Sequence, residues 1–148
     1  SVLTQHAASS QIVGYGASVS ALGFLPLAGA LRGFIDLVFQ HEGKFYLVDY
    51  KSNFLGTTPD AYAAAALQAE MLRHHYVLQY HLYAVALHRF LAVRVPDYAY
   101  DRHFGGVAYL FLRGMQPERP GSGVFFDLPT RSMIEALSAV LEQRESTP

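Results

Sequence analysis

The sequence predicts a single α/β domain built on a mixed sheet of about four or five strands flanked by helices. Three observations carry this prediction: two β-rich runs joined by a tight turn, two amphipathic helical patterns, and a later apolar run typical of a strand buried on both faces. The chain has 148 residues, 51% of them hydrophobic. That is enough for one core, and no linker or internal repeat indicates a second domain.

The N-terminal part of the chain gives the weakest signal. Residues 1–30 contain no Asp, Glu, Lys or Arg, and they show no sustained period of a helix or a strand. We expect this segment to be irregular, with a short strand around Ile12, and we expect residues 31–143 to form the core of the single domain 1–148.

The signal sharpens at two β-rich runs, Leu31–Phe39 and Lys44–Lys51. A turn at Glu42 and Gly43 between them predicts a two-residue hairpin, which pairs His41 with Lys44.

Two helices are expected next. Thr58, Pro59 and Asp60 provide a capping hydroxyl, a proline for the first helical position and an early carboxylate, so we expect a helix from about Pro59 to His74. A second helical pattern begins at Tyr76 and ends near Val95, before a proline.

Three elements are expected in the C-terminal third. The apolar run Gly105–Leu112 predicts a central strand buried on both faces, and the short run Val124–Asp127 predicts an edge strand. A helical stripe that begins at Met133 predicts a closing helix.

Composition excludes several classes of protein. The longest apolar stretch, 21–31, is interrupted by glycine and proline and is shorter than the roughly 20 residues of a membrane-spanning helix, so we expect no membrane association. The absence of cysteine excludes a disulfide framework and, with no basic start typical of a secretory signal, favours the cytoplasm. The net charge of −1 excludes nucleic-acid binding by overall charge alone.

The hairpin carries the residues of chemical interest. Asp49 and Lys51 are two apart on a strand and therefore share a face, and the expected register places Asp36 opposite Asp49. Facing carboxylates repel each other in a sheet, so they need a cation. Oxygen ligands without thiolate suit Mg²⁺ or Mn²⁺. The alternative is that the two aspartates end solvent-facing strands and that Lys51 discourages edge-to-edge aggregation.

Three segments resemble the motifs of the PD-(D/E)XK nuclease superfamily in the form used by RecB-type nucleases: Gly33–Asp36, Asp49–Lys51 and Gln79–Tyr83. The resemblance covers most of the chain from Leu31 to Gly114. It implies a restriction-endonuclease-like fold and a Mg²⁺-dependent deoxyribonuclease domain that acts in recombinational repair. DNA and the other subunits of a RecBCD-like helicase–nuclease are the implied partners, and ATP belongs only to the helicase part of such a protein.

The resemblance also implies roles for individual residues. Asp36 and Asp49 would bind the metal together with the backbone carbonyl of Tyr50, and Lys51 would position or activate the attacking water. Gln79 and Tyr83 match a Q-x-x-x-Y element, and their i, i+4 spacing places both on one face of a helix. For these two residues the alternative is ordinary helix packing.

One departure from the family pattern bears on activity. The family has a further metal ligand, a histidine in RecB-type nucleases, on a helix upstream of Asp36, and His6 does not match its context. We therefore expect the chain to begin after that helix and to cleave DNA poorly when isolated. A non-catalytic nuclease-like module that binds protein or DNA is the alternative function.

Overall fold

The computed structural model describes residues 33–145 of the chain. Its elements follow the order β1 (Leu37–His41), β2 (Lys44–Lys51), η2 (Pro59–Tyr62), α3 (Ala64–Arg73), α4 (Tyr76–Arg94), α5 (Tyr100–His103), β3 (Phe104–Phe111), η3 (Leu112–Gly114), β4 (Val124–Asp127) and α6 (Arg131–Glu145). The segment expected to be irregular, with its strand around Ile12, lies outside the described residues. Within 33–145 no helix is both long and apolar enough to cross a membrane.

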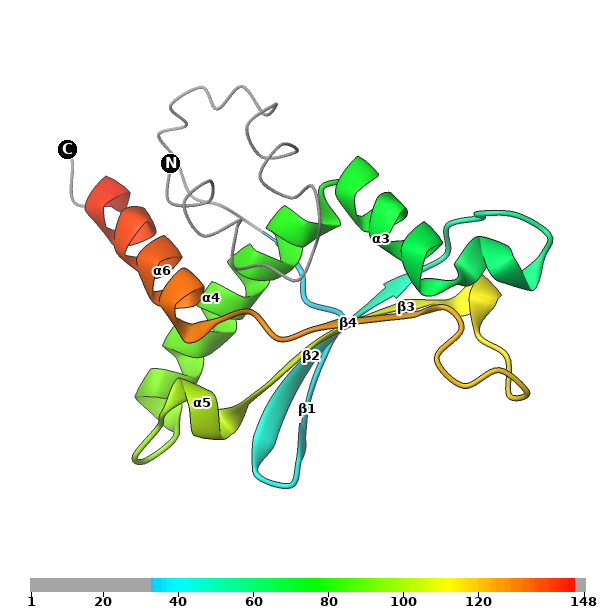
Figure 1. Ribbon diagram of the computed structural model, residues 1–148. Coiled ribbons are helices and arrows are strands. Elements are labelled where there is room, and N and C mark those ends of the chain that lie inside the picture. Colours follow the sequence, from blue (N-terminus) through cyan, green and yellow to red (C-terminus); the bar gives the residue numbers. More distant parts are fainter. Residues whose placement is uncertain (1–32, 146–148) are drawn as a thin grey trace.

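The four described strands form one sheet in the order β1-β2-β3-β4. The central pair, β2 and β3, is parallel, whereas β1 and β4 are antiparallel to their neighbours. Helices α3, α4 and α6 lie to one side of the sheet (Figure 1). The predicted α/β fold with a mixed sheet flanked by helices is confirmed.

The hairpin has the predicted register, with His41 paired to Lys44. Its turn residues, Glu42 and Gly43, have φ angles of 49° and 78°, as a two-residue type I′ turn requires. The first strand is shorter than expected, because β1 begins at Leu37 and Asp36 lies at a bend before it.

The helix predicted over Pro59–His74 is divided in two. Its first turn is the 3₁₀ helix η2, and Ala63 is extended, with φ −69° and ψ 160°, before α3 begins. The cause is tertiary: the Tyr62 hydroxyl donates to the Asn53 carbonyl at 3.3 Å and accepts from the Leu55 amide at 3.1 Å. These bonds anchor η2 to the loop after β2 rather than to α3.

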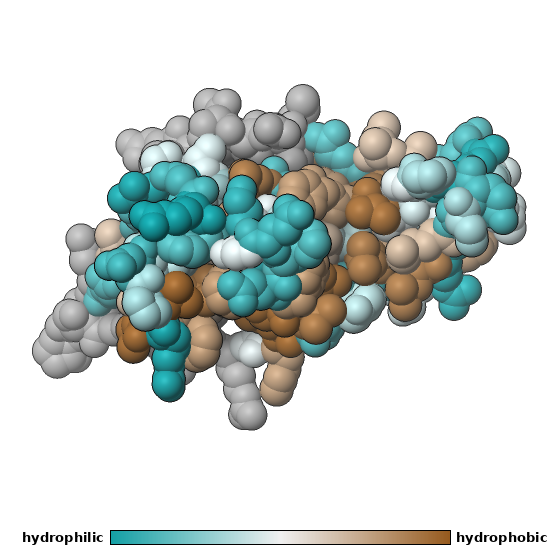
Figure 2. All heavy atoms as spheres, turned by 90° about the horizontal axis from the view of Figure 1, so that it is seen from below, coloured by the Kyte–Doolittle hydropathy of each residue, from teal (hydrophilic) through white to brown (hydrophobic). Residues whose placement is uncertain are grey.

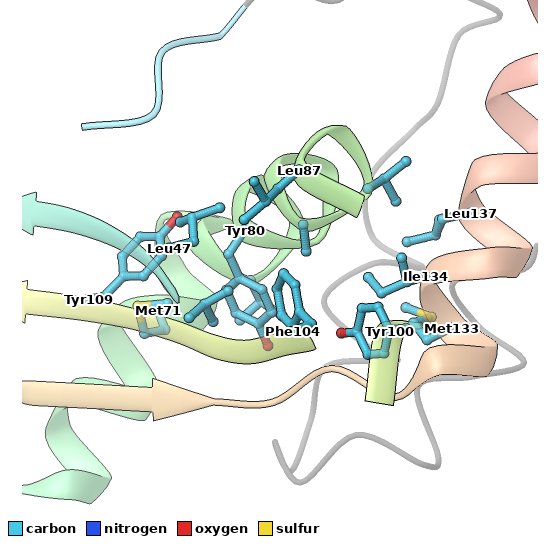
Figure 3. Close-up of a cluster of buried hydrophobic side chains, with 14 of the residues drawn as sticks. Leu47, Met71, Tyr80, Leu87, Tyr100, Phe104, Tyr109, Met133, Ile134 and Leu137 are labelled. Atoms are coloured by element: carbon cyan, nitrogen blue, oxygen red, sulfur yellow. The ribbon is translucent and has the colours of Figure 1, made fainter. Parts of the chain in front are cut away.

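The core lies between the sheet and the helices. One cluster of buried side chains contains Tyr80 and Leu87 of α4, Leu47 of β2 and Tyr109 of β3, and side chains from α6 lie at one end of it (Figure 3). Strands β3 and β4 follow the predicted central and edge strands, β3 being displaced by one residue. The helix that closes the domain, α6, packs against α4 through hydrogen bonds from the Arg89 guanidinium to Ser138.

The opposite face of the sheet is apolar and partly open. Phe39 and Tyr46 stack with ring centroids 5.1 Å apart, and the alternation of the strands also places Tyr50 and Phe126 on this face, where both are exposed. Seen from below, the surface has apolar side chains grouped near its middle (Figure 2). The charged residues of interest therefore lie on the other, helix-covered face.

Candidate active site

Strand β2 brings Asp49 and Lys51 together beneath the helices. The Lys51 Nζ lies 2.5 Å from the Asp49 Oδ2, and both side chains are largely buried. Their strand neighbours across the parallel pairing are Tyr109 and Phe111 of β3, which are also buried. An ion pair has thus been placed on the face of the sheet that forms the core.

Asp36 reaches the same site from the exposed bend before β1. Its Oδ2 accepts a hydrogen bond of 2.9 Å from the Tyr50 backbone N–H. The side chain of Asp36 thus accepts a hydrogen bond from the backbone of β2. This bond competes with strand pairing, and the chain is bent at Asp36. The expected position of Asp36 inside a strand, directly opposite Asp49, is corrected to this point one residue before β1.

The electrostatics of Asp49 favour a bound cation. Burial raises the pKa of its carboxyl and the negative charge of Asp36 raises it further, whereas the Lys51 ammonium lowers it; the net shift is upward. The short contact with Lys51 is an ion pair rather than a well-directed hydrogen bond, because Asp49 Oδ2 is buried without a hydrogen-bond partner among the described residues. A buried, incompletely satisfied carboxylate oxygen gains from coordination.

Helix α4 supplies the polar contacts of Lys51. The ammonium donates to the Gln79 Oε1 at 3.3 Å, and the Gln79 Nε2 donates to the Tyr83 hydroxyl at 3.2 Å. Both side chains are only partly buried. Of the residues predicted from the sequence, the structure thus joins Lys51, Gln79 and Tyr83 by hydrogen bonds, and the ion pair of Lys51 connects them to Asp49. Their catalytic roles stay predictions.

Two tyrosines belong to this site that the sequence had not indicated. The Tyr109 hydroxyl donates to the same Gln79 Oε1 at 2.9 Å, and the Lys51 Nζ lies 4.0 Å from the ring centroid of Tyr76 and 5.0 Å from that of Tyr109. These rings stabilise the ammonium through cation–π contacts. Tyr109 belongs to the site because it pairs with Asp49 across the parallel strands β2 and β3. No turn joins these two strands directly, so the sequence does not reveal which residues pair.

A second buried carboxylate, Glu70 of α3, lies beside the site. It accepts hydrogen bonds from the Asn53 side chain at 2.8 Å and from the Arg73 guanidinium at 2.6 Å, and His74 lies 3.0 Å away. Burial raises the pKa of Glu70, but these hydrogen bonds and positive charges outweigh it, so the net shift is downward. The Asn53 side chain also donates to the Tyr76 hydroxyl at 3.3 Å, which connects this network to the ring beneath Lys51.

The donor set suits a hard cation with open coordination positions. Asp36 and Asp49 offer carboxylate oxygens, and the raised pKa of Asp49 together with its incompletely satisfied oxygen fits a metal ion there. No group of three or more His, Cys, Asp or Glu residues placed to hold a metal occurs in the part of the chain that the structure describes. His6 lies outside that part, and the Tyr50 carbonyl as a ligand stays a prediction.

Comparison with protein families gives an independent result. The family model described as the PD-(D/E)XK nuclease superfamily matches residues 2–146. That match covers nearly the whole chain, including all of the site residues above.

Individual proteins also match over most of this chain. The RecBCD enzyme subunit RecB of Escherichia coli is 53% identical over 113 residues, which are 76% of this chain and 10% of that protein. The subunit of the same name from Haemophilus influenzae is 57% identical over 120 residues, 81% of this chain and 10% of that protein. The one from Mycobacterium tuberculosis is 47% identical over 131 residues, 84% of this chain and 12% of that protein. The chain thus spans about a tenth of the length of these relatives.

Proposed function

The chain belongs to the PD-(D/E)XK nuclease superfamily, and we propose that its site hydrolyses phosphodiester bonds of DNA with the help of Mg²⁺. In this proposal the chain is the nuclease domain of a RecBCD-type helicase–nuclease, an exodeoxyribonuclease V, and acts in the repair of double-strand breaks. The observation that carries it is the pair of contacts that Lys51 makes, with Asp49 and with Gln79. In this arrangement a buried carboxylate with an incompletely satisfied oxygen lies beside an ammonium group that Gln79 fixes in place.

Asp36, Asp49 and the Tyr50 carbonyl would hold the metal ion. When bound, that ion neutralises phosphate charge and increases the acidity of water. The protein residues then have separate tasks. Lys51 holds a positive charge where negative charge develops on the phosphate, and it orients the attacking water. A charge fixed in advance by the protein stabilises a transition state without reorganisation.

Gln79 is a positioning residue in this scheme. Its Oε1 accepts hydrogen bonds from both the Lys51 ammonium and the Tyr109 hydroxyl. The amide is therefore fixed with its oxygen toward Lys51 and its nitrogen toward Tyr83. The rings of Tyr76 and Tyr109 restrict the ammonium further. Because these contacts come from α4 and β3, the ammonium remains in place before substrate arrives.

Substrate would be delivered by other parts of the assembly. The net charge of −1 provides no general attraction for DNA. We infer that the helicase part, which uses ATP, and the other subunits of a RecBCD-like complex guide DNA strands to this domain. The domain itself then needs only local contacts with the strand.

The test is Asp49→Ala in the full-length protein assembled with its partner subunits. We expect DNA cleavage with Mg²⁺ to fall about a thousandfold or more, because metal-based charge stabilisation contributes several kcal/mol, while ATP-driven unwinding persists. Asp60→Ala is the matched control, since Asp60 is an exposed aspartate on η2. Parallel loss of cleavage and unwinding in a folded Asp49→Ala protein would contradict the role proposed for Asp49.

The alternative function is a non-catalytic module that binds protein or DNA. It is favoured by the observation that only two carboxylates, Asp36 and Asp49, meet in the described part of the site. Titration with Mn²⁺ separates the two proposals, because an intact pair binds the ion and a degenerate one does not.

A cleavage assay also tests whether the metal needs a ligand besides Asp36, Asp49 and the Tyr50 carbonyl. Linear single-stranded DNA is incubated with Mg²⁺ and either this chain or a version extended upstream. Robust and equal cleavage by both would show that no upstream ligand is needed.

A further inference from the structure

The segments just beyond the carboxyl ends of β2 and β3 form an edge that the proposed chemistry leaves unused. These two strands are parallel, with Lys51 paired to Phe111, so the segments that follow them, 52–55 and 112–113, emerge side by side. The carboxyl end of a parallel pair is where α/β proteins commonly bind ligands. In this protein the edge begins one residue after Lys51, the lysine of the proposed chemistry.

Arg113 places a positive charge at this edge. Its Nε donates to the Ser52 carbonyl at 2.8 Å, which fixes the guanidinium against the loop after β2. The side chain is exposed and forms no ion pair with the side chains that the structure describes, those of residues 33–142. The two terminal nitrogens of an arginine held in this way are available for a phosphate group.

Phe54 places an exposed aromatic ring on the same loop. It is 63% exposed and lines a shallow cavity of about 340 Å³ between the loop and α3. The rest of the lining combines small apolar side chains with one ion pair: Leu55, Ala61, Ala66, Ala69, Glu70 and Arg73. The loop is held by the bond from the Leu55 amide to Tyr62 and by the bond from Asn53 to Glu70. A ring kept at the surface in this way is arranged to stack before any ligand binds.

This cavity adjoins the catalytic centre. Glu70, which lines it, is bonded to Asn53, and Asn53 is bonded to the Tyr76 hydroxyl. The Tyr76 ring in turn lies 4.0 Å from the Lys51 Nζ. Three side-chain contacts, which pass through Asn53 and Tyr76, therefore connect the lining of the cavity with the lysine.

We propose that this edge binds the single-stranded part of the substrate next to the bond that is cleaved. Arg113 binds the neighbouring phosphate, and an unpaired base stacks on Phe54 beside the alanine side chains that line the cavity. A positive group that follows the backbone, combined with an aromatic ring for a base, is the general means by which proteins hold single strands. The proposal rests on the function proposed above and adds two residues, Phe54 and Arg113, that hold the strand beside the bond that is cleaved.

Helix α4 offers a matched control pair. Phe90 is 58% exposed, and the guanidinium carbon of Arg94 lies 5.7 Å from its ring centroid. Phe90 is eleven residues beyond Gln79 on the helix, or roughly 16 Å at 1.5 Å per residue. This pair has the same chemistry as Phe54 and Arg113 without their position at the site.

The first experiment measures cleavage by the full-length complex without ATP, on single-stranded oligonucleotides of increasing length. We expect Phe54→Ala to raise KM about five- to tenfold, as loss of one stacked base does, with little change in kcat. Arg113→Gln raises KM and reduces the slope of log KM against log salt by roughly 0.7, the value for one lost phosphate contact on a single strand. Phe54→Trp and Arg113→Lys retain most of the affinity, which separates binding from loop folding.

The second experiment needs no cleavage. Oligonucleotides with 2-aminopurine at successive positions are bound to the Asp49→Asn complex without divalent metal, and the fluorescence quenched by stacking is recorded. We expect quenching at one position near the scissile bond, and its loss in Phe54→Ala.

Three results would overturn the proposal: KM values for Phe54→Ala and Arg113→Gln equal to those of Phe90→Ala and Arg94→Gln, equal effects on blunt duplex DNA, or quenching that Phe54→Ala leaves intact. Failure of the nuclease proposal is a separate outcome, seen as metal-dependent cleavage that Asp49→Ala does not reduce.

Discussion

Asp49 and Glu70 are carboxylates buried to a similar degree, 4% and 6% exposed, but their surroundings differ. Glu70 is bonded to Asn53 and Arg73 and lies against His74, and its pKa is lowered. Asp49 has one cation, Lys51, an oxygen without a well-directed donor, and a raised pKa. Burial of a charge therefore does not by itself mark an active site.

The difference lies in how completely each charge is satisfied. The network around Glu70 holds the loop after β2 to α3 and needs no ligand. The surroundings of Asp49 leave part of its charge available, which costs stability but suits a group that binds a cation. If this distinction is right, substitutions at the two positions should have opposite effects.

The largest expected effect comes from removing the cation beside Asp49. Lys51→Met leaves a buried carboxylate without its partner, and we expect the free energy of unfolding at neutral pH to fall by about 3 kcal/mol. Chemical denaturation of this chain measures it. The double variant Lys51→Met with Asp49→Asn should regain most of the loss, because no buried charge remains. A change in the double variant equal to the sum of the two single changes would show that Asp49 and Lys51 do not interact as described.

Glu70→Gln tests the other side of the comparison. We expect a loss of about 2 kcal/mol at neutral pH, because Arg73 and His74 lose the charge that they contact. Since the pKa of Glu70 is lowered on folding, its stabilising contribution is complete above the unfolded value of 4.5 and is lost as the pH falls through the folded pKa. The deficit of the variant should therefore disappear in acid. A deficit that persists unchanged in acid would show that packing, not charge, holds Glu70.

Much of the site could be predicted because its determinants are local in sequence. The turn at Glu42 and Gly43 sets the register of the hairpin, which brings Asp36 near Asp49, and alternation along β2 places Lys51 on the same face. The i, i+4 spacing on α4 places Gln79 and Tyr83 together. Each of these relations depends on geometry within one or two adjacent elements.

The rest depends on contacts between distant segments. Tyr109 reaches Gln79 only because β3 pairs in parallel with β2 at one particular register, and no turn fixes that register. The interruption at Ala63 follows from bonds between Tyr62 and the loop after β2, which the capping pattern at Thr58 does not reveal. The spacing of Glu70 to Arg73 and His74 is local, but its bond to Asn53 depends on the distant loop after β2 and has no signal in the sequence.

Tyr109→Phe sharpens the comparison within the site itself. The change removes one hydrogen bond to the Gln79 Oε1, and at about 1 kcal/mol for such a bond we expect kcat to fall about fivefold with little change in KM. Tyr80→Phe is the control, because its hydroxyl donates to Asp127 at 2.6 Å within the core. It should lower stability without lowering kcat. Equal effects of the two variants on kcat would contradict a positioning role for Tyr109.

The smallest expected effect is a gain in stability, and it is the most direct test of the contrast with Glu70. Asp49→Asn removes a carboxylate whose pKa is raised on folding, mainly by burial. A raised pKa means that the charged form is less favourable in the folded state. The wild-type chain therefore loses stability as the pH rises from the unfolded value of 3.8 through the folded pKa, and the loss is complete above it.

The asparagine variant has no such loss, so without metal it should be more stable than wild type at neutral pH and equal to it in strong acid. Denaturation curves of both chains between acid and neutral pH, in the presence of a chelator, measure the difference. Saturating Mg²⁺ should reverse the order, because only wild type gains from an ion that binds the folded state. An asparagine variant that is less stable than wild type at neutral pH in chelator would show that the pairing of Asp49 with Lys51 outweighs the cost of burial, and that this carboxylate, like Glu70, is satisfied without a ligand.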